Sequence, residues 1–235
     1  MGLFFGRDRK KDSEAERAAQ EAAFGDPQKV DDDMVTKFIQ QLLEVGIDGR
    51  GPLKSAVQLA DKARAKHKNT EDAVDEVAGD ALKALAAGGF VTGLGGFVTL
   101  PVALPANILE FYVLAARMTA SIAHLRGYDT SKPEVRSAVL LTLTGAKAEE
   151  VLQKAGVGGA VSGRVTNLAL GKLPAAALMM VNKGVGFQIL RSTASKTLAK
   201  LGKGVPVVGG VIGGGMDGWM GRRIADAARE SFPQR

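Results

Sequence analysis

Residues 84–109 read ALAAGGFVTGLGGFVTLPVALPANIL and form the longest uncharged run of the chain, between Lys83 and Glu110. A membrane-spanning helix needs about 20 apolar residues, so the length of this run would allow one. Its glycines and two prolines, however, disfavour an uninterrupted helix. We therefore predict a helical hairpin or re-entrant turn around residues 93–105, with arms too short to cross a bilayer.

The candidate membrane or hairpin residues of this run are Phe90, Phe97, Leu100, Pro101 and Pro105. Two environments suit such a segment, because close helix packing through glycine occurs both in lipid and in a protein core. The sequence leaves open whether residues 84–109 insert into lipid or are buried in the protein.

A second glycine-rich run, GVPVVGGVIGGGM, covers residues 204–216 and leads into a predicted C-terminal helix that continues through Phe232. Gly210, Gly214 and Gly218 are spaced four apart, which predicts a strip on which another backbone can approach closely. Residues 213–218 also satisfy the pattern G-x-G-x-x-G. Only 17 residues follow Gly218, too few for the rest of a dinucleotide-binding unit, so we reject that interpretation.

Between the two runs, a helix predicted over residues 102–126 carries a polar stripe on an otherwise apolar surface. At 100° per residue, five of its polar side chains fall within one sector about 100° wide; they are Asn107, Glu110, Arg117, Ser121 and His124. Such a helix is buried on most sides, and its stripe must meet water or other polar groups. One hypothesis is a structural ion pair between Glu110 and Arg117, and the other is a polar site inside the bundle.

The rest of the chain also shows helical periodicity, interrupted by glycine and proline. Val-, Ile- and aromatic-rich alternating strands are scarce, so a β-sandwich is not expected. The remaining helices are predicted at about 12–24, 31–46, 52–67, 70–87, 133–145, 147–154, 160–170 and 174–200. We predict an all-α protein: a flexible or helical N-terminal extension (1–30) and one multi-helix bundle (31–235), with the glycine/proline-rich hairpin and the C-terminal glycine-strip helix.

Charge is distributed unevenly. Residues 1–129 hold 16 basic and 19 acidic side chains, whereas residues 130–235 hold 15 basic and 6 acidic, and residues 151–203 contain no acid. Because its like charges repel one another, we expect such a stretch to face either an anionic partner or bulk water. Nucleic acid is disfavoured because Phe187 is the one aromatic residue among these positions. The candidate basic surface consists of Lys172, Lys183, Arg191, Lys196, Lys200 and Lys203.

The N-terminus places a short apolar run before a basic cluster, which is the reverse of a signal peptide. One interpretation is an interfacial anchor formed by Leu3, Phe4, Phe5, Arg7, Arg9, Lys10 and Lys11. The other is a disordered tail.

Several kinds of chemistry are excluded by composition. The chain has no cysteine and two histidines, so thiol nucleophiles and Cys- or multi-His-ligated metal sites are ruled out. The P-loop, H-E-x-x-H and G-x-S-x-G motifs are all missing. No metal, cofactor or catalytic residue is expected.

Two separated motifs carry a family resemblance. Residues 89–106, GFVTGLGGFVTLPVALPA, followed by ARM (116–118), IA (122–123) and RGYD (126–129), resemble the EcsC family signature. In that family a glycine-rich segment runs into a proline-containing helix that ends in a Tyr-Gly-Tyr-Asp-like corner, where Arg126 here replaces the first Tyr. Residues 206–217, PVVGGVIGGGMD, resemble the family's C-terminal glycine-rich element. The resemblance spans roughly residues 70–232, leaves the first 30 residues outside, and implies a helical protein with membrane-like segments but no transferable catalytic residues.

These patterns favour a non-enzymatic, membrane-associated or lipid-interacting protein whose basic C-terminal half binds an anionic membrane surface. We expect it in the cytoplasm, peripherally attached to the inner face of the membrane, with anionic lipid as partner. A homo-oligomer or a membrane-protein partner is also compatible with the sequence. The alternatives are a hydrolase-like enzyme that uses the polar stripe on a lipid-like substrate, and a soluble helical protein that oligomerises and binds partners.

Overall fold

A computed structural model of the protein describes residues 30–51, 53–87, 106–157, 170–201 and 211–235. Within these ranges the chain forms eight α-helices, two short helical turns and no strand, which confirms the predicted all-α fold. The elements are α2 (Asp32–Gln41), η1 (Leu42–Ile47), α3 (Ala56–Lys66), α4 (Thr70–Ala87), α6 (Ala106–Leu125), α7 (Pro133–Thr142), η2 (Gly145–Lys147), α8 (Ala148–Lys154), α10 (Ala175–Leu201) and α11 (Val211–Ser231).

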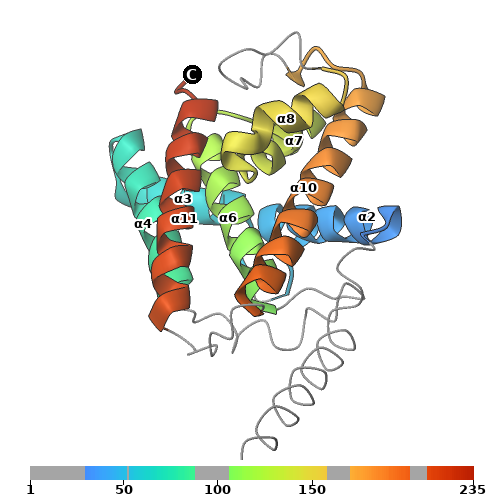
Figure 1. Ribbon diagram of the computed structural model, residues 1–235. Coiled ribbons are helices and arrows are strands. Elements are labelled where there is room, and N and C mark those ends of the chain that lie inside the picture. The colour runs from blue at the N-terminus through green and yellow to red at the C-terminus, as the bar shows by residue number, and fades with distance from the viewer. Residues whose placement is uncertain (1–29, 52, 88–105, 158–169, 202–210) are drawn as a thin grey trace, which may run out of the picture.

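Helix α6 lies at the centre of the bundle (Figure 1), and every residue in 109–123 is buried. Its neighbours are α3, α4, α7, α11 and the π-helical turn η1, whereas α10 packs against α2, α7 and α8. This central position follows from the sequence, because a helix that is apolar on most sides is stable only when other helices cover it.

Local sequence signals explain where several helices begin and end. Asp31 caps α2 by accepting a hydrogen bond from the backbone N–H of Met34 at 2.7 Å. Ser55 and Gln58 form a reciprocal capping box at the start of α3. Gly127 ends α6 with φ +87°, a conformation that suits glycine.

The sequence prediction was wrong in two details of this region. A single α-helix was expected over residues 31–46, but from Leu42 the chain winds as a π-helix, closed by a hydrogen bond from Asp48 N to Leu43 O at 3.0 Å. Here Gly46 lies against α6, so close that a Cβ would be 3.0 Å from the Ala116 Cβ. The next helix begins at Ala56, after the Ser55 cap, and not at the Gly51–Pro52 turn.

The predicted glycine/proline-rich hairpin falls mainly on residues 88–105, outside the described residues. The same holds for the N-terminal extension up to residue 29 and the helix expected at 160–170. None of the helices in the described ranges is sufficiently long and apolar to cross a bilayer.

Candidate functional site

The polar stripe of α6 faces η1 and α3. Arg117 donates from Nη2 to the carbonyl oxygen of Val45 at 3.0 Å, and Ser121 Oγ donates to the carbonyl oxygen of Ala56 at 2.9 Å. Both side chains are buried, and burial lowers the pKa of the Arg117 guanidinium. Within the described structure, Arg117 Nε has no hydrogen-bond partner. These contacts hold α6 against its neighbours through backbone carbonyls.

The two ends of the stripe have different environments. Glu110 is buried. Asn107 belongs to the first turn of α6, and its side chain is not among the described parts of the structure. At the other end, His124 is partly exposed, and its Nε2 lies 3.2 Å from Asp61 Oδ1 on α3. The hydrolase hypothesis requires these side chains to converge on an accessible cavity. It loses support because Arg117 and Ser121 are buried against neighbouring backbone.

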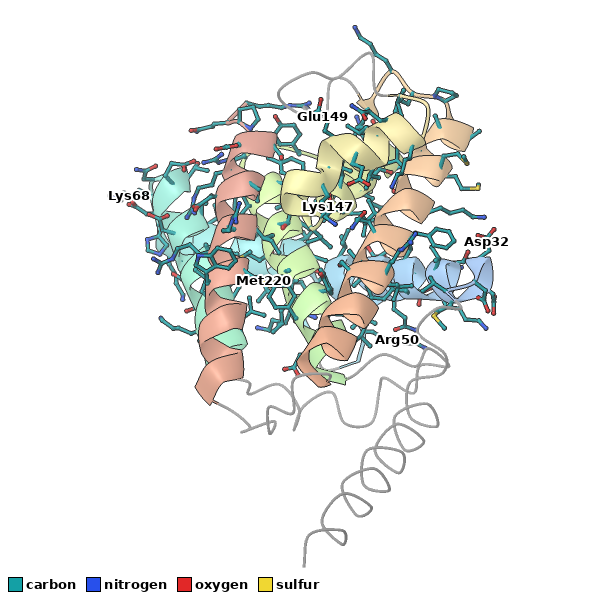
Figure 2. The ribbon with its side chains drawn as sticks, in the orientation of Figure 1. Asp32, Arg50, Lys68, Lys147, Glu149 and Met220 are labelled. Atoms are coloured by element: carbon teal, nitrogen blue, oxygen red, sulfur yellow. The ribbon has the colours of Figure 1, made fainter. Side chains whose placement is uncertain are left out.

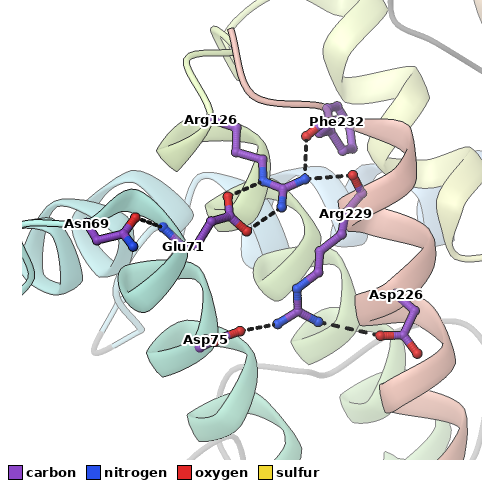
Figure 3. A network of polar contacts seen from close by, with 7 residues as sticks. All are labelled: Asn69, Glu71, Asp75, Arg126, Asp226, Arg229 and Phe232. Carbon is purple, nitrogen blue, oxygen red and sulfur yellow. Dashed lines mark hydrogen bonds and ion pairs between the residues drawn. The ribbon is translucent and has the colours of Figure 1, made fainter.

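A second polar network joins three helices at the end of α6 (Figure 3). Arg126 binds Glu71 of α4 through two hydrogen bonds, Nε to Oε1 at 3.0 Å and Nη2 to Oε2 at 2.6 Å. Its Nη1 also donates to the carbonyl oxygens of Arg229 and Phe232, at 2.6 and 2.9 Å. These carbonyls belong to the last turn of α11 and the residue after it, where no intrahelical partner exists. Arg126 therefore caps α11 while it anchors α4.

A parallel ion pair strengthens the same junction one helical turn away. Arg229 of α11 contacts Asp75 of α4 at 2.7 Å and Asp226 of its own helix at 3.5 Å (Figure 3). Tyr128 and Phe232 pack edge to face beside Arg126, with ring centroids 5.2 Å apart. Neither Arg126 nor Arg229 was among the site residues predicted from the sequence.

The residues of the candidate basic surface are spread along the whole length of α10. Lys172 is exposed in the turn before α10, whereas Lys196 and Lys200 belong to the last two turns of that helix. A helix of 27 residues is about 40 Å long, so these positions mark opposite ends of the bundle. Between them, Lys183 binds Asp32 of α2 at 2.8 Å, and Arg191 is exposed. Lys203 and the side chains of Lys196 and Lys200 lie outside the description.

Four helix ends next to the two glycine-rich runs lie together. Helix α4 ends at Ala87 and α6 begins at Ala106, both within the first run, while α10 ends at Leu201, just before the second run, and α11 begins at Val211 within it. All four lie at the lower end of the bundle in Figure 1. We call this the glycine end. Lys196 and Lys200 belong to it. Lys68 lies at the other end (Figure 2), and Lys172 lies in the turn before α10, at the end of that helix away from Leu201.

The glycine strip of α11 packs against the last turns of α4. A Cβ on Gly218 would meet the Ala86 Cβ at 3.8 Å, an ordinary contact. At Gly221, which the sequence analysis did not select, a Cβ would lie 2.6 Å from Leu85 Cδ1 and 2.9 Å from Leu82 Cδ2. The closest approach is therefore at Gly221. Gly214 belongs to the first turn of α11, and Gly210 lies outside the described residues.

Two further sets of candidate residues also lie outside the described part of the chain. They are the N-terminal anchor, Leu3, Phe4, Phe5, Arg7, Arg9, Lys10 and Lys11, and the hairpin set, Phe90, Phe97, Leu100, Pro101 and Pro105. For these the sequence predictions stand as predictions.

Comparison with protein families matches residues 15–235 to the EcsC protein family. The chain belongs to the EcsC family. The match begins at residue 15, so it includes half of the N-terminal extension that the resemblance was expected to leave out. Comparison with curated proteins and with solved structures gives no match.

Within this EcsC protein, the corner after α6 joins three parts of the fold. The guanidinium of Arg126 pairs with Glu71 and caps α11. Arg235 lies over the ring of Tyr128, with its guanidinium carbon 4.0 Å from the ring centroid. Asp129 accepts hydrogen bonds from the backbone and hydroxyl of Ser131, which lower the pKa of its carboxyl. The corner thus holds the C-terminus of the chain against the core.

Proposed function

We propose that this EcsC protein is a non-enzymatic, peripheral membrane protein whose glycine end binds an anionic lipid surface. The proposal places it at the inner, cytoplasmic face of the membrane. The observation that carries it is the position of the four helix ends at Ala87, Ala106, Leu201 and Val211, which lie at the same end of the bundle. The helix ends that adjoin both uncharged glycine-rich runs therefore lie at one end of the bundle.

Charge at the end of α10 supports the same orientation. The helix contains four basic residues and no acidic one, and two of the four, Lys196 and Lys200, are spaced one turn apart at the glycine end. A basic residue near an anionic leaflet contributes about 1 kcal/mol, so single residues bind weakly and several acting together bind reversibly. Apolar contacts from the two runs would add to this attraction.

The polar contacts inside the bundle agree with a structural scaffold. Arg117, Ser121 and Arg126 each bind main-chain carbonyl oxygens of neighbouring elements. Hydrogen bonds of this kind fix the relative positions of helices, and they engage Arg117 and Ser121 of the stripe in contacts with neighbouring backbone. We therefore favour membrane attachment over hydrolysis.

Co-sedimentation of the full-length protein with vesicles tests the proposal. We expect pelleting with vesicles that contain an anionic phospholipid, less pelleting with phosphatidylcholine alone, and release at high salt because exposed charges are screened. Equal, negligible pelleting with both vesicle types at low salt would overturn the proposal. A protein that stays in the supernatant as a defined oligomer would instead favour the soluble partner-binding alternative.

A matched pair of variants tests the orientation. Lys196→Glu/Lys200→Glu reverses two charges at the glycine end, and Lys68→Glu/Lys172→Glu reverses two exposed charges at the opposite end. Net charge changes equally in both. We expect the first variant to lose most of its binding to anionic vesicles and the second to keep most of it. Equal loss in the two variants would show that net charge alone drives binding, which would contradict the proposed orientation.

A further inference from the structure

The exposed face of α11 carries the single tryptophan of the chain. Trp219 is 58% exposed, although large aromatic side chains usually find cover in a folded protein. The guanidinium of Arg223 lies over its ring, 5.0 Å from the centroid, and Arg222 beside it is exposed. A tryptophan with two adjacent arginines thus faces solvent on the outside of the bundle.

Helix α4 lies beside α11 and runs in the opposite direction, as the contacts along the pair show. Gly218 and Gly221 approach Ala86 and the leucines of the last α4 turns, whereas Arg229 pairs with Asp75 near the other end of α4. Residues at the same distance from the glycine end can therefore be compared between the two helices.

On the exposed sides of α4 and α11, the type of residue changes in the same order with distance from the glycine end. On α11, Trp219 is followed by Arg222 and Arg223, and these are followed by exposed acids at Asp226 and Glu230. In the sequence, the positions three and seven residues before Trp219 are the apolar Met216 and Ile212.

On α4, read from the same end, Ala86 comes first, then Lys83, and then a series of acids. Lys83 is 82% exposed and contacts Asp80 at 3.4 Å, and Asp75 and Asp72 are exposed farther from the glycine end. From the glycine end, the sequence of each helix thus has small or apolar residues first, then exposed basic residues, then exposed acidic residues. The band of Lys83, Arg222 and Arg223 separates the acids from the glycine end.

This order matches the polarity profile of a membrane surface. Tryptophan favours the boundary between acyl chains and headgroups, and basic residues favour the level of the phosphates. With 1.5 Å per residue, Arg222 and Arg223 lie about 5 Å above Trp219, and Asp226 and Glu230 lie about 10 and 16 Å above it. Measured from the level of Arg222 and Arg223, where the phosphates would lie, Asp226 is about 5 Å and Glu230 about 11 Å away. The Debye length is about 8 Å at physiological salt, so the repulsion between Glu230 and the lipid surface is largely screened, whereas that of Asp226 is only partly screened.

We propose that the face formed by α4 and α11 is the lipid-contacting side of the glycine end, with Trp219 at the lipid–water boundary and Lys83, Arg222 and Arg223 on anionic headgroups. This inference rests on the proposed function and adds to it the residues that make the contact. We assign this face to a bilayer and not to a partner protein, because the same order of apolar, basic and acidic residues occurs along two antiparallel helices. One acid, Asp217, precedes Trp219, and its position is about 200° away around the helix.

The single tryptophan makes the contact measurable in the full-length wild-type protein, because its fluorescence reports on position 219 alone. We expect a blue shift of the emission with anionic vesicles and no shift with phosphatidylcholine vesicles. Lipids brominated near the headgroup end of the acyl chain should quench the emission more than lipids brominated near the chain terminus. Pelleting with unchanged, unquenched emission would overturn this inference and leave the proposed function intact, whereas loss of pelleting would overturn both.

Variants separate a direct contact from a general effect. Arg222→Ala/Arg223→Ala should weaken binding to anionic vesicles roughly 10- to 30-fold, the equivalent of two surface charges. Lys68→Ala/Lys172→Ala, with the same change in net charge at the opposite end, should bind almost as the wild type does. Equal affinities of the two double variants would refute the assignment.

A second matched pair tests the apolar contribution of Trp219. Trp219→Ala should reduce pelleting at high salt, where screened charges contribute least. Met180→Ala removes a side chain of similar exposure, 53%, from the early turns of α10, far from the glycine end. It should leave pelleting unchanged. A larger loss for Met180→Ala than for Trp219→Ala would place the lipid contact elsewhere.

Discussion

Replacement of Arg126 by alanine should destabilise the whole bundle. The guanidinium makes four hydrogen bonds that connect the end of α6 with α4 and with the last turn of α11. Its side chain is 9% exposed, and that of its partner Glu71 is 43% exposed. The junction also closes over Phe232, which is fully buried. Truncation therefore removes the polar link between segments that are more than 50 residues apart in the chain.

The size of the destabilisation depends on which partners of Arg126 stay buried without a hydrogen bond after its truncation. The carbonyl oxygens of Arg229 and Phe232 lose a charged donor in a buried or partly buried place, and each unsatisfied acceptor costs about 1 to 3 kcal/mol. Glu71 is exposed enough to be hydrated again, so the ion pair itself contributes at most about 1 kcal/mol. We expect Arg126→Ala to lower the free energy of unfolding by about 3 kcal/mol, a large part of the stability of an ordinary domain.

Urea unfolding followed by circular dichroism measures this change, and an unchanged m-value would show that the unfolding transition is comparable. Arg126→Lys keeps the charge but not the forked geometry, so it should recover no more than about half of the loss. Arg222→Ala is the control, because it truncates an exposed arginine of α11 and should stay within about 0.5 kcal/mol of wild type. If Arg126→Ala and Arg222→Ala prove equally stable, the network is a surface contact without energetic importance and the argument fails.

Other predictions concern packing and pH. Gly221→Ala should destabilise the protein by about 1 kcal/mol, because the cost of overpacking against the leucines of α4 exceeds the gain in helix propensity. Gly218→Ala has room for its Cβ and should stabilise the protein by up to about 1 kcal/mol. The melting temperatures of the two variants should therefore shift in opposite directions. Hydrogen bonds from Lys66 and His67 lower the pKa of Glu76 below its usual 4.5, so their stabilising effect is present above that pH and is lost as pH falls through the lowered pKa. The melting temperature of Glu76→Gln should therefore fall less steeply than that of the wild type between about pH 5 and 3, and parallel curves would disprove the role of this carboxylate.

Most helix positions could be predicted from the sequence, because their determinants are local. Asn69 and the acids after it predict the start of α4, and the pattern of Met34, Val35 and Phe38 predicts α2. The π-turn of η1 could not be predicted in this way. Within it, Gly46 packs closely against Ala116, a residue 70 positions away that a local pattern does not include.

The candidate site was predicted in part. Spacing alone placed Arg117 and Ser121 on one side of α6, but which neighbours they meet depends on how α3 and η1 pack there. Arg126 gave no local signal, since its partners Glu71 and Arg229 lie 55 and 103 residues away. An arginine that caps a distant helix has the same sequence context as one that faces water.

The two glycine-rich runs, residues 84–109 and 204–216, show what each level of structure determined. By itself the sequence determined that both are uncharged, that glycine and proline interrupt them, and that helices flank them, because these properties depend on residue type and short-range geometry. Only the tertiary structure decided that the flanking ends of α4, α6, α10 and α11 lie together, and that Trp219 and its arginines face outward beside α4. Such proximity depends on how the helices bury their apolar sides around α6, a long-range outcome that no short segment encodes.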